Sequence, residues 1–312
     1  MQQATVAMLE EVVDVVGSWQ HDGLPVHVHP GDLGWLWRFG AQQVVDGLWL
    51  WRSDGRLDGR LDGLSDGRLD GRSDGRLVAV GMVDGAEGLI RMAISPEVGD
   101  DEFFARRFVD DLSDSDRGVL PSGRGVAEVR YGPAVRGLLS RRGWIADESW
   151  TPLSRDLAAP VQDCGVRIET VDAQHVRDEV VRDRVAVQRA AFPNSTFTVK
   201  RWHALAASPA YRSGRCLVAY DTDDQAVAAT TVWSAGSGRP GLIEPLGTHR
   251  AFRGRGYGCA IAVAAAAELQ KMGASSVVVC TPTSNVGGIA AYLSAGFTKL
   301  ADVTDFRRPD SA

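Results

Sequence analysis

The residues best suited to chemistry in this sequence lie in the glycine-rich segment Arg253-Gly-Arg-Gly-Tyr-Gly258, between a β-rich run and a long alanine-rich run. Glycines let the backbone curl until successive N–H groups point at one anion, and the start of a following helix adds partial positive charge. Arg253 and Arg255 add full positive charges. The pattern therefore predicts a binding site for a diphosphate.

Two other phosphate-binding loops do not fit this segment. A Walker loop requires Gly-Lys-Ser/Thr, which is absent. A dinucleotide-binding loop requires Gly-x-Gly-x-x-Gly and an acidic residue at the end of the next strand, whereas this chain has Gly254-x-Gly256-x-Gly258 and a next strand ending at Thr281. A glycine-rich turn that only connects two elements remains the alternative.

The same segment resembles the acetyl-CoA pyrophosphate signature of the GNAT acetyltransferases, Gln/Arg-x-x-Gly-x-Gly/Ala, with matches at Arg253, Gly256 and Gly258. The resemblance covers roughly residues 165–308. It implies a mixed, mostly antiparallel twisted sheet flanked by helices.

A second stretch resembles the family's other motif, in which an Asn is followed by a Tyr and then by a Gly-Phe pair. Here these are Asn285, Tyr292 and Gly296-Phe297. The chain departs from the family at Gly287-Gly288, where alanines are usual. We expect this departure to loosen the start of the helix and to touch no functional atom.

The resemblance implies an N-acetyltransferase that uses acetyl-CoA as co-substrate and acetylates a primary amine of a small molecule, such as an antibiotic or a metabolite. The amine attacks the thioester carbonyl directly and CoA thiolate leaves. Backbone N–H groups are expected to hold the pyrophosphate, while a strand edge pairs with the pantetheine arm and one N–H, of Leu246 or Gly247, polarises the thioester oxygen. The implied cofactor-binding residues are Leu246, Gly247, Thr248, Arg253, Gly254, Arg255, Gly256, Tyr257, Gly258, Cys259 and Asn285.

Two catalytic roles are carried over from the resemblance. Tyr292 is the expected general acid, since a phenol with a pKa of about 10 is protonated at neutral pH and can protonate the leaving thiolate. Its alternative role is that of an aromatic core residue. Glu244 is the expected general base for an amine that is only about 0.1% neutral at pH 7, with a simple anchor for the substrate's charge as the alternative. Pro245 predicts a bulge or splay in the strand.

Other residues near the motifs have weaker assignments. Asn285 is expected mainly to cap its helix, with pantetheine contact as a second role. Trp202, Trp233 and residues 195–197 are possible lining of the acceptor pocket, with core or cap roles as alternatives. His249 is expected to be a solvated loop histidine rather than a phosphate ligand.

The elements that position these residues follow the order β-α-α-β-β-β-α-β-α-β from residue 166 onward, an α/β pattern. The strand before the glycine loop is expected at 242–248 and the helix after it at about 256–272. Asp172 is expected to cap a helix that runs to about Ala191, and Thr198 to cap a second one. The buried face of the first helix is expected to carry Val176, Val180, Val187 and Ala191.

The N-terminal half is expected to be a degenerate copy of the same fold. Residues 138–144, Leu-Leu-Ser-Arg-Arg-Gly-Trp, resemble residues 291–297, and strands are expected at 47–52, 76–83, 88–94 and 126–130. No glycine nest follows the third of these strands, so we expect no acetyl-CoA binding there. The predicted domains are 1–158, the degenerate copy, and 159–312, the catalytic domain. The first is expected to pack against the second and to wall the acceptor site.

Residues 53–76 form six tetrads of the Ser/Leu-Asp-Gly-Arg/Leu type. Glycine at every fourth position excludes a helix, and the few apolar groups cannot offset the entropy of ordering. We expect an inserted, mobile loop between two paired strands and no calcium site.

Composition narrows the class of protein. A net charge of −6 without a basic run disfavours a nucleic-acid binder, and the N-terminus lacks the pattern of a signal peptide. The four widely spaced cysteines predict no metal site. We expect a cytoplasmic protein without a membrane partner, as monomer or homodimer. The functional alternatives are a non-enzymatic CoA-binding sensor and a protein N-acetyltransferase.

Overall fold

The computed structural model describes residues 1–53, 56–57, 60–61, 75–84 and 88–309. Contacts divide the chain into two compact units. The first comprises residues 1–19, 45–148 and 304–312, and the second comprises residues 20–44 and 149–303. These units differ from the ranges 1–158 and 159–312, because residues 20–44 pack within the second unit and the C-terminal strand packs within the first.

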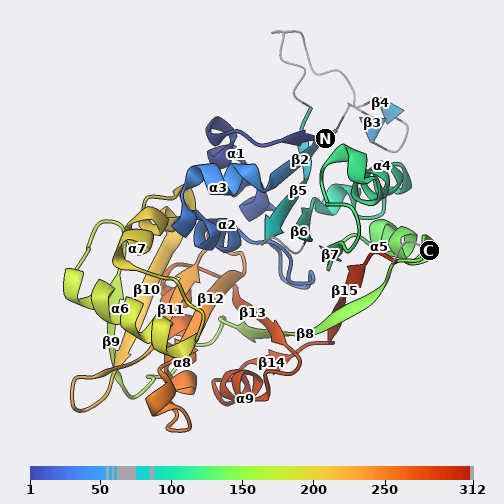
Figure 1. Ribbon diagram of the computed structural model, residues 1–312. Coiled ribbons are helices and arrows are strands. Elements are labelled where there is room, and N and C mark those ends of the chain that lie inside the picture. The colour runs from blue at the N-terminus through green and yellow to red at the C-terminus, as the bar shows by residue number, and fades with distance from the viewer. Residues whose placement is uncertain (54–55, 58–59, 62–74, 85–87, 310–312) are drawn as a thin grey trace. The chain divides into compact units, whose positions relative to one another are not determined.

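The first unit is built on a mixed sheet in the order β1-β2-β5-β6-β7-β15, in which only the β6–β7 pair is parallel (Figure 1). Its strands are β1 (Gln2–Gln3), β2 (Leu48–Arg52), β5 (Leu77–Asp84), β6 (Leu89–Ile94), β7 (Val126–Glu128) and β15 (Val303–Arg307). Its helices are α1 (Leu9–Ser18), α4 (Glu102–Ser113) and α5 (Pro133–Arg141), with the short helices η1 (Val6–Met8), η3 (Pro96–Val98) and η4 (Ser115–Arg117). Since β2 pairs with β5, the repeat at 53–76 joins two paired strands as predicted.

Most of the repeat lies outside the described residues, so the predicted mobile loop stays a prediction. Its described parts are β3 (Arg56–Leu57) and β4 (Arg60–Leu61), which pair antiparallel with each other.

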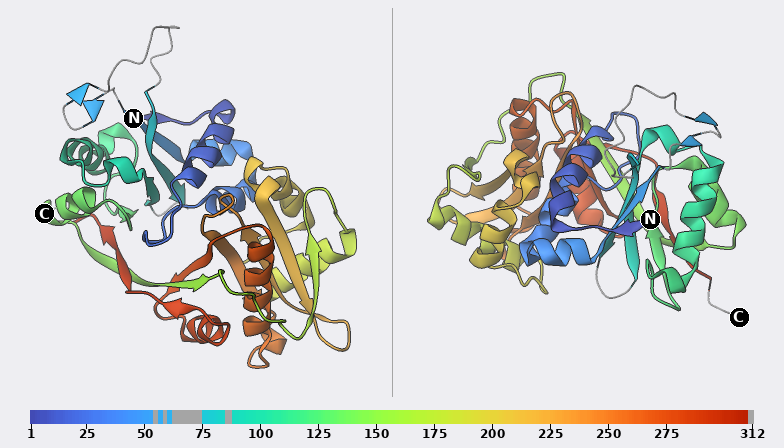
Figure 2. Two further views of the ribbon diagram at one scale, coloured as in Figure 1. Left: turned by 180° about the vertical axis from the view of Figure 1, so that it is seen from behind. Right: turned by 90° about the horizontal axis from the view of Figure 1, so that it is seen from above.

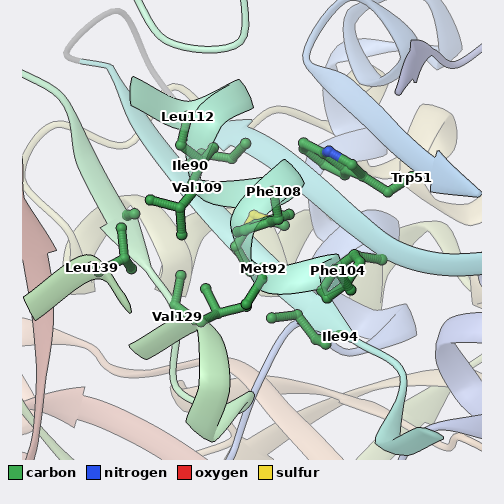
Figure 3. Close-up of a cluster of buried hydrophobic side chains, with 14 of the residues drawn as sticks. Trp51, Ile90, Met92, Ile94, Phe104, Phe108, Val109, Leu112, Val129 and Leu139 are labelled. Atoms are coloured by element: carbon green, nitrogen blue, oxygen red, sulfur yellow. The ribbon is translucent and has the colours of Figure 1, made fainter. Parts of the chain in front are cut away.

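The core of the first unit forms where α4 lies over the sheet. Figure 3 shows Phe108, Val109 and Leu112 of α4 packed over Ile90 and Met92 of β6. Asp101 caps α4, because its carboxylate accepts from the N–H groups of Phe103 and Phe104 at the start of the helix.

The second unit has a sheet in the order β8-β13-β12-β11-β10-β9, with only β12 and β13 parallel; the short β14 also pairs with β8. Its strands are β8 (Ile145–Asp156), which enters from the first unit, β9 (Arg167–Val171), β10 (Gly214–Tyr220), β11 (Ala226–Trp233), β12 (Gly241–Thr248), β13 (Ser276–Pro282) and β14 (Thr298–Lys299).

Helices cover both faces of this sheet. Helices α6 and α7 lie in front of it in Figure 1, and α8 lies in front in the reverse view of Figure 2. The helices are α2 (Pro30–Leu36), α3 (Ala41–Asp46, which crosses into the first unit), α6 (Asp178–Ala191), α7 (Val199–Ala206), α8 (Tyr257–Lys271) and α9 (Val286–Ser294), with η2 (Trp37–Phe39), η5 (Pro209–Ser213) and η6 (Arg250–Phe252). The apolar face of α8 packs on Leu217, Val232 and Ile243.

The start of α6 differs from the prediction. The Asp172 carboxylate accepts from the N–H groups of Gln174 and His175, which closes a turn, and the helix begins only at Asp178. Val176, expected on the buried face, is therefore exposed, whereas Val180, Val187 and Ala191 are buried as expected.

Candidate functional site

The glycine-rich segment joins β12 to α8 through η6. Gly254 and Gly256 have φ angles of +77° and +87°, the left-handed region that favours glycine. Among the described residues, no acceptor is within hydrogen-bonding geometry of any backbone amide from Gly254 to Cys259; the first helical bond runs from Ala260 N to Gly256 O at 3.0 Å. The segment thus offers a run of free amides at the positive end of a helix, which suits a phosphate group.

The two arginines of the segment have different surroundings. Arg253 donates from Nη2 to the carbonyl of Ala191 at 2.7 Å, at the end of α6. Its neighbour Arg250 donates from Nε to the carbonyl of Ala190 at 3.0 Å. Arg255 stays exposed, with its guanidinium 5.3 Å from the centre of the Phe252 ring. The expectation that both Arg253 and Arg255 lie at a diphosphate stays a prediction; the Arg253 side chain donates one of its N–H groups to the end of α6.

Strands β12 and β13 separate beside this segment. They pair only at Gly241↔Val277 and Leu242↔Val278, although β12 continues to Thr248. The predicted bulge is also present, because Thr230 pairs with Leu246 while Val232 pairs with Ile243, which leaves two residues of β12 opposite one of β11. The stretch from Leu246 to Thr248 therefore pairs with β11 on one side, and no described strand pairs with its other edge.

Two glycines set the close approaches around this edge. A Cβ on Gly247 would come within 2.6 Å of Ala191 Cβ, so only glycine lets α6 lie this near β12. A Cβ on Gly258 would meet Thr248 Oγ1 at 3.2 Å, which places the first turn of α8 against the end of β12.

Tyr292 and Glu244 lie close enough to interact electrostatically. Tyr292 is buried on α9, and burial first and the negative charge of Glu244 second raise the pKa of its phenol above the ordinary value of 10. Among the described residues no side chain accepts its proton, and its ring packs edge-on against Phe297 at 5.3 Å. Both predicted readings of Tyr292 therefore keep support: its ring belongs to the core and its hydroxyl holds a transferable proton.

Asn285 caps helix α9 as expected. Its Oδ1 accepts from Gly288 N at 3.1 Å, and its Nδ2 donates to Thr281 Oγ1 at 2.8 Å. The expectation that Gly287-Gly288 touches no functional atom is wrong at Gly288, since a Cβ there would lie 2.4 Å from Asn285 Nδ2. Glycine at 288 is what gives the cap its room.

The other predicted pocket residues are largely internal. Trp202 and Trp233 are buried; their Nε1 atoms donate to Cys216 Sγ at 3.3 Å and to the Glu244 carbonyl at 2.7 Å. Ser195 accepts from Phe197 N, Phe197 is buried, and Thr196 is exposed. His249 is partly exposed and its Nδ1 accepts from Ala251 N, which makes it the cap of η6.

The packing of α2 on Trp233 was not predicted from the sequence. A Cβ on Gly31 or Gly34 would come within 2.4 Å of the Trp233 ring, so α2 rests directly on that indole. His29 caps α2 through Nδ1, which accepts from Gly31 N, and its Nε2 lies 3.3 Å from the Pro240 carbonyl. The only signal in the sequence was the His-Pro pair at 29–30, a cap residue followed by proline.

A surface groove of about 660 Å³ lies along the outer face of α6. Of the predicted site residues only Ser195 lines it. Its lining residues are Arg182, Val185, Ala186, Arg189, Ala190, Pro193, Ser195, Val199 and Arg250.

The first unit repeats the order of elements but not the site. Gly143 and Gly296 have φ of +82° and +81°, and each is followed by an N–H that bonds back to the preceding helix, Trp144 to Leu139 and Phe297 to Tyr292, both at 3.1 Å. Leu139 thus stands where the second unit has Tyr292.

The turn before α4, which corresponds to the glycine-rich segment, is also different. There the Asp101 carboxylate accepts from Phe103 N at 2.7 Å and from Phe104 N at 3.0 Å. The register of β5 and β6 is regular from Ala79 to Asp84, without a bulge. In the first unit the Asp101 carboxylate accepts the hydrogen bonds of the amides that would otherwise be available to a phosphate.

Two features are absent from the described residues. None of their helices is long and apolar enough to cross a bilayer. No group of three or more His, Cys, Asp or Glu side chains among them is arranged to hold a metal ion.

Comparison with known families matches residues 178–297 to the acetyltransferase (GNAT) family. No curated protein matches the sequence. The matched range begins with α6 and ends at Phe297, so it contains the glycine-rich segment, the bulge and Tyr292.

Several solved structures are similar. An acetyltransferase from the GNAT family from Colwellia psychrerythraea has 11% identity, with 97% of each chain covered and a TM-score of 0.57. A tandem GNAT protein from the clavulanic acid biosynthesis pathway has 17% identity, with 76% of this chain and 80% of that chain covered and a TM-score of 0.55. A GCN5-related N-acetyltransferase from Sphaerobacter thermophilus has 16% identity, coverage of 75% and 77%, and a TM-score of 0.50. At these identities the likeness concerns the fold.

Proposed function

Residues 178–297 are an acetyltransferase domain of the GNAT family, and from this premise we propose that the protein transfers an acetyl group from acetyl-CoA to a primary amine of a small molecule. Family membership makes the domain an acyltransferase that uses an acyl-CoA. Acetyl as the acyl group and a small amine as the acceptor are our proposals.

The residues present fit the cofactor at two places. The free amides from Gly254 to Cys259 would hold the pyrophosphate, with charge from Arg255. The free edge of β12 from Leu246 to Thr248 would pair with the amide groups of the pantetheine arm, in the manner of an added strand. An N–H of this edge would then polarise the thioester oxygen.

Glu244 and Tyr292 would handle the two protons of the reaction. The Glu244 carboxylate takes a proton from the ammonium of the acceptor, the freed nitrogen forms the new C–N bond, and the C–S bond breaks. The Tyr292 phenol gives its proton to the departing thiolate, and the second proton that the nitrogen loses on becoming an amide returns to the Tyr292 oxygen. The raised pKa of Tyr292 keeps that proton in place at neutral pH.

The observation that carries this proposal is the run of unbonded amides at left-handed glycines, directly beside the separated edges of β12 and β13. A turn that served only as a connection would satisfy its own N–H groups or expose them at random. This turn lies between a free strand edge and a helix start, and the three together match one extended ligand.

The test combines turnover with binding. CoA release is measured with acetyl-CoA and a panel of aminoglycosides, polyamines, amino acids and peptide N-termini, and acetyl-CoA binding is measured by calorimetry. We expect release with at least one small amine. Binding of acetyl-CoA without turnover of any amine would favour the sensor, and turnover of peptides alone would favour a protein acetyltransferase.

A matched pair of variants tests the loop. Gly256→Ala places a side chain at φ +87°, where it costs about 1–2 kcal/mol unless the backbone relaxes and the amides turn away. We expect about tenfold weaker acetyl-CoA binding or worse. Gly143→Ala is the control, because its glycine is also left-handed, has an equally open surrounding and lies in the first unit. Equal affinities for the two variants would contradict the assignment of the loop.

A further inference from the structure

Arg184 carries a positive charge into the interior of the second unit with no carboxylate beside it. The residue is 0% exposed and lies on the inner face of α6. Its guanidinium donates to Gln188 Oε1 at 2.8 Å and to Thr231 Oγ1 at 3.3 Å, and it also interacts with the side chain of Cys216. Its Nε has no partner, and no ion pair to Arg184 is found in the part of the chain that the structure describes.

The rest of its surroundings is also neutral or apolar. The Cys216 thiol and the Tyr211 phenol lie nearby, and the ring of Phe197 lies 5.4 Å from the guanidinium carbon. Burial lowers the pKa of the guanidinium, which remains charged. A buried charge without a counter-ion is strongly unfavourable, and proteins normally pair such a charge or neutralise it. This arrangement therefore calls for an anion that the chain itself does not supply.

Arg184 lies next to the proposed reaction centre. Thr231, which it bonds, lies on β11 between the register pairs Thr230↔Leu246 and Val232↔Ile243, hence opposite the bulge at Glu244. The buried cation and the proposed base thus lie at the same level of two neighbouring strands.

We propose that Arg184 binds a carboxylate of the acceptor, so that the acceptor is a small amine that also carries a carboxylate, as amino acids do. This inference rests on the proposed function. Glu244 takes the ammonium end and Arg184 the anionic end, with Nε and one terminal nitrogen matching the two carboxylate oxygens. In the structure Nε is covered, and Phe197, in the connection between α6 and α7, would have to move aside from the guanidinium for the acceptor to reach it.

The first experiment needs no variant. Initial rates are measured for each amino acid and for its carboxamide. Because amidation changes the pKa of the amine, kcat/KM is calculated from the concentration of the neutral amine in each case. We expect kcat/KM to favour the carboxylate by about 10- to 100-fold, the range for a hydrogen bond to a charged group. Equal kcat/KM within the pairs would overturn the inference.

Variants separate recognition from structure. Arg184→Met removes the charge at similar length, and we expect it to abolish the carboxylate preference while the Tm stays unchanged or rises, because an uncompensated buried charge has been removed. Arg184→Lys should restore part of the preference. Arg182→Met, on the exposed face of the same helix, is the control and should keep the full preference.

A structural arginine would give a different pattern. Arg184→Met would then lower the Tm by several degrees and reduce kcat/KM equally for both members of each pair, which would overturn the inference. If that variant does not fold, the wild-type pairs and Arg184→Lys decide. Calorimetry with acetyl-CoA separates the two proposals: no binding by the wild type contradicts the proposed function, whereas normal binding and turnover without a carboxylate preference contradict only the role of Arg184.

Discussion

At the scale of single residues, the environment of Tyr292 decides what its hydroxyl can do. Two effects raise its pKa, burial and the nearby negative charge of Glu244, and both favour the neutral phenol. The group therefore stays protonated well above neutral pH, as a general acid must before the thiolate departs. A tyrosine at the surface would hold its proton less firmly.

We predict that Tyr292→Phe lowers kcat by about 100-fold or more, because protonation of the leaving group is lost. The affinity for acetyl-CoA should not change, since the proposed cofactor contacts are backbone groups. In the wild type, ionisation of Tyr292 should reduce kcat only above pH 10, because its pKa is raised. Steady-state rates across pH and calorimetry measure these effects.

The control for this prediction is Tyr220→Phe, which removes a phenol that donates to Asp183 at 2.8 Å, away from the motifs. It should leave kcat within about twofold. If Tyr292→Phe retains wild-type kcat, the residue serves only as the core aromatic.

At the scale of elements, the start of α9 shows how one glycine can be required while its neighbour is not. A Cβ on Gly287 would meet no atom within 4 Å, whereas a Cβ on Gly288 would collide with Asn285. We predict that Gly287→Ala stabilises the protein by about 0.5–1 kcal/mol through helix propensity. Gly288→Ala should destabilise it by about 1 kcal/mol, the usual value of a lost cap.

Urea denaturation of the two alanine variants tests this prediction, each serving as the control for the other. Shifts of the same sign and size would show that the Asn285 cap contributes nothing.

Helix α2 should make the protein sensitive to acid. Burial lowers the pKa of His29 from 6.5 to about 4. Between pH 6.5 and pH 4 the imidazole is therefore protonated in the unfolded state and neutral in the folded state. Stability contributed by the neutral imidazole is thus complete above pH 6.5 and is lost as the pH falls toward 4. The loss is about 1.4 kcal/mol per pH unit in that window.

His29→Asn tests this prediction, because asparagine can still cap α2 but does not titrate. Between pH 7 and 4.5 we expect the wild type to lose about 2 kcal/mol more stability than the variant, as measured by urea denaturation. Parallel losses in the two proteins would show that His29 is protonated in the folded state.

At the scale of the whole molecule, the two units share an order of elements but differ in every feature that the proposed site uses. The first unit has the Asp101 carboxylate on its helix amides, no bulge, and Leu139 in place of Tyr292. We therefore predict one acetyl-CoA per chain in a calorimetric titration. Residual saturable binding in Gly256→Ala at a second stoichiometric site would contradict this prediction.

Much of the second unit could be predicted from sequence because its signals are local. Thr198 and Asn285 cap their helices as expected, and the strand and helix around the glycine-rich segment lie where periodicity put them. The start of α6 was predicted too early because Asp172 is a cap residue by type, yet its carboxylate closes a turn instead. Local sequence does not distinguish these two uses.

The features that could not be predicted depend on contacts between residues that are far apart in the sequence. Helix α2 has two glycines in seven residues and a poor intrinsic helix propensity. The helix is stabilised by packing on Trp233, which is distant in sequence, and only glycine at positions 31 and 34 allows this close contact. The burial of Arg184 could not be predicted either, since an arginine directly after Arg182 and Asp183 is expected to be solvated.

The paths of residues 20–44 and 304–312 through the two units also bear on how the protein is made. When the first half of the chain has been synthesised, α2 and β7 are present but their packing partners are not. Helix α2 packs on Trp233 and β7 pairs with β15, and both partners are synthesised later. Neither unit is complete until its segments near residue 303 have been synthesised. A chain that ended before β15 would leave the edge of β7 that β15 covers unpaired, and such an edge is a template for pairing with strands of other chains.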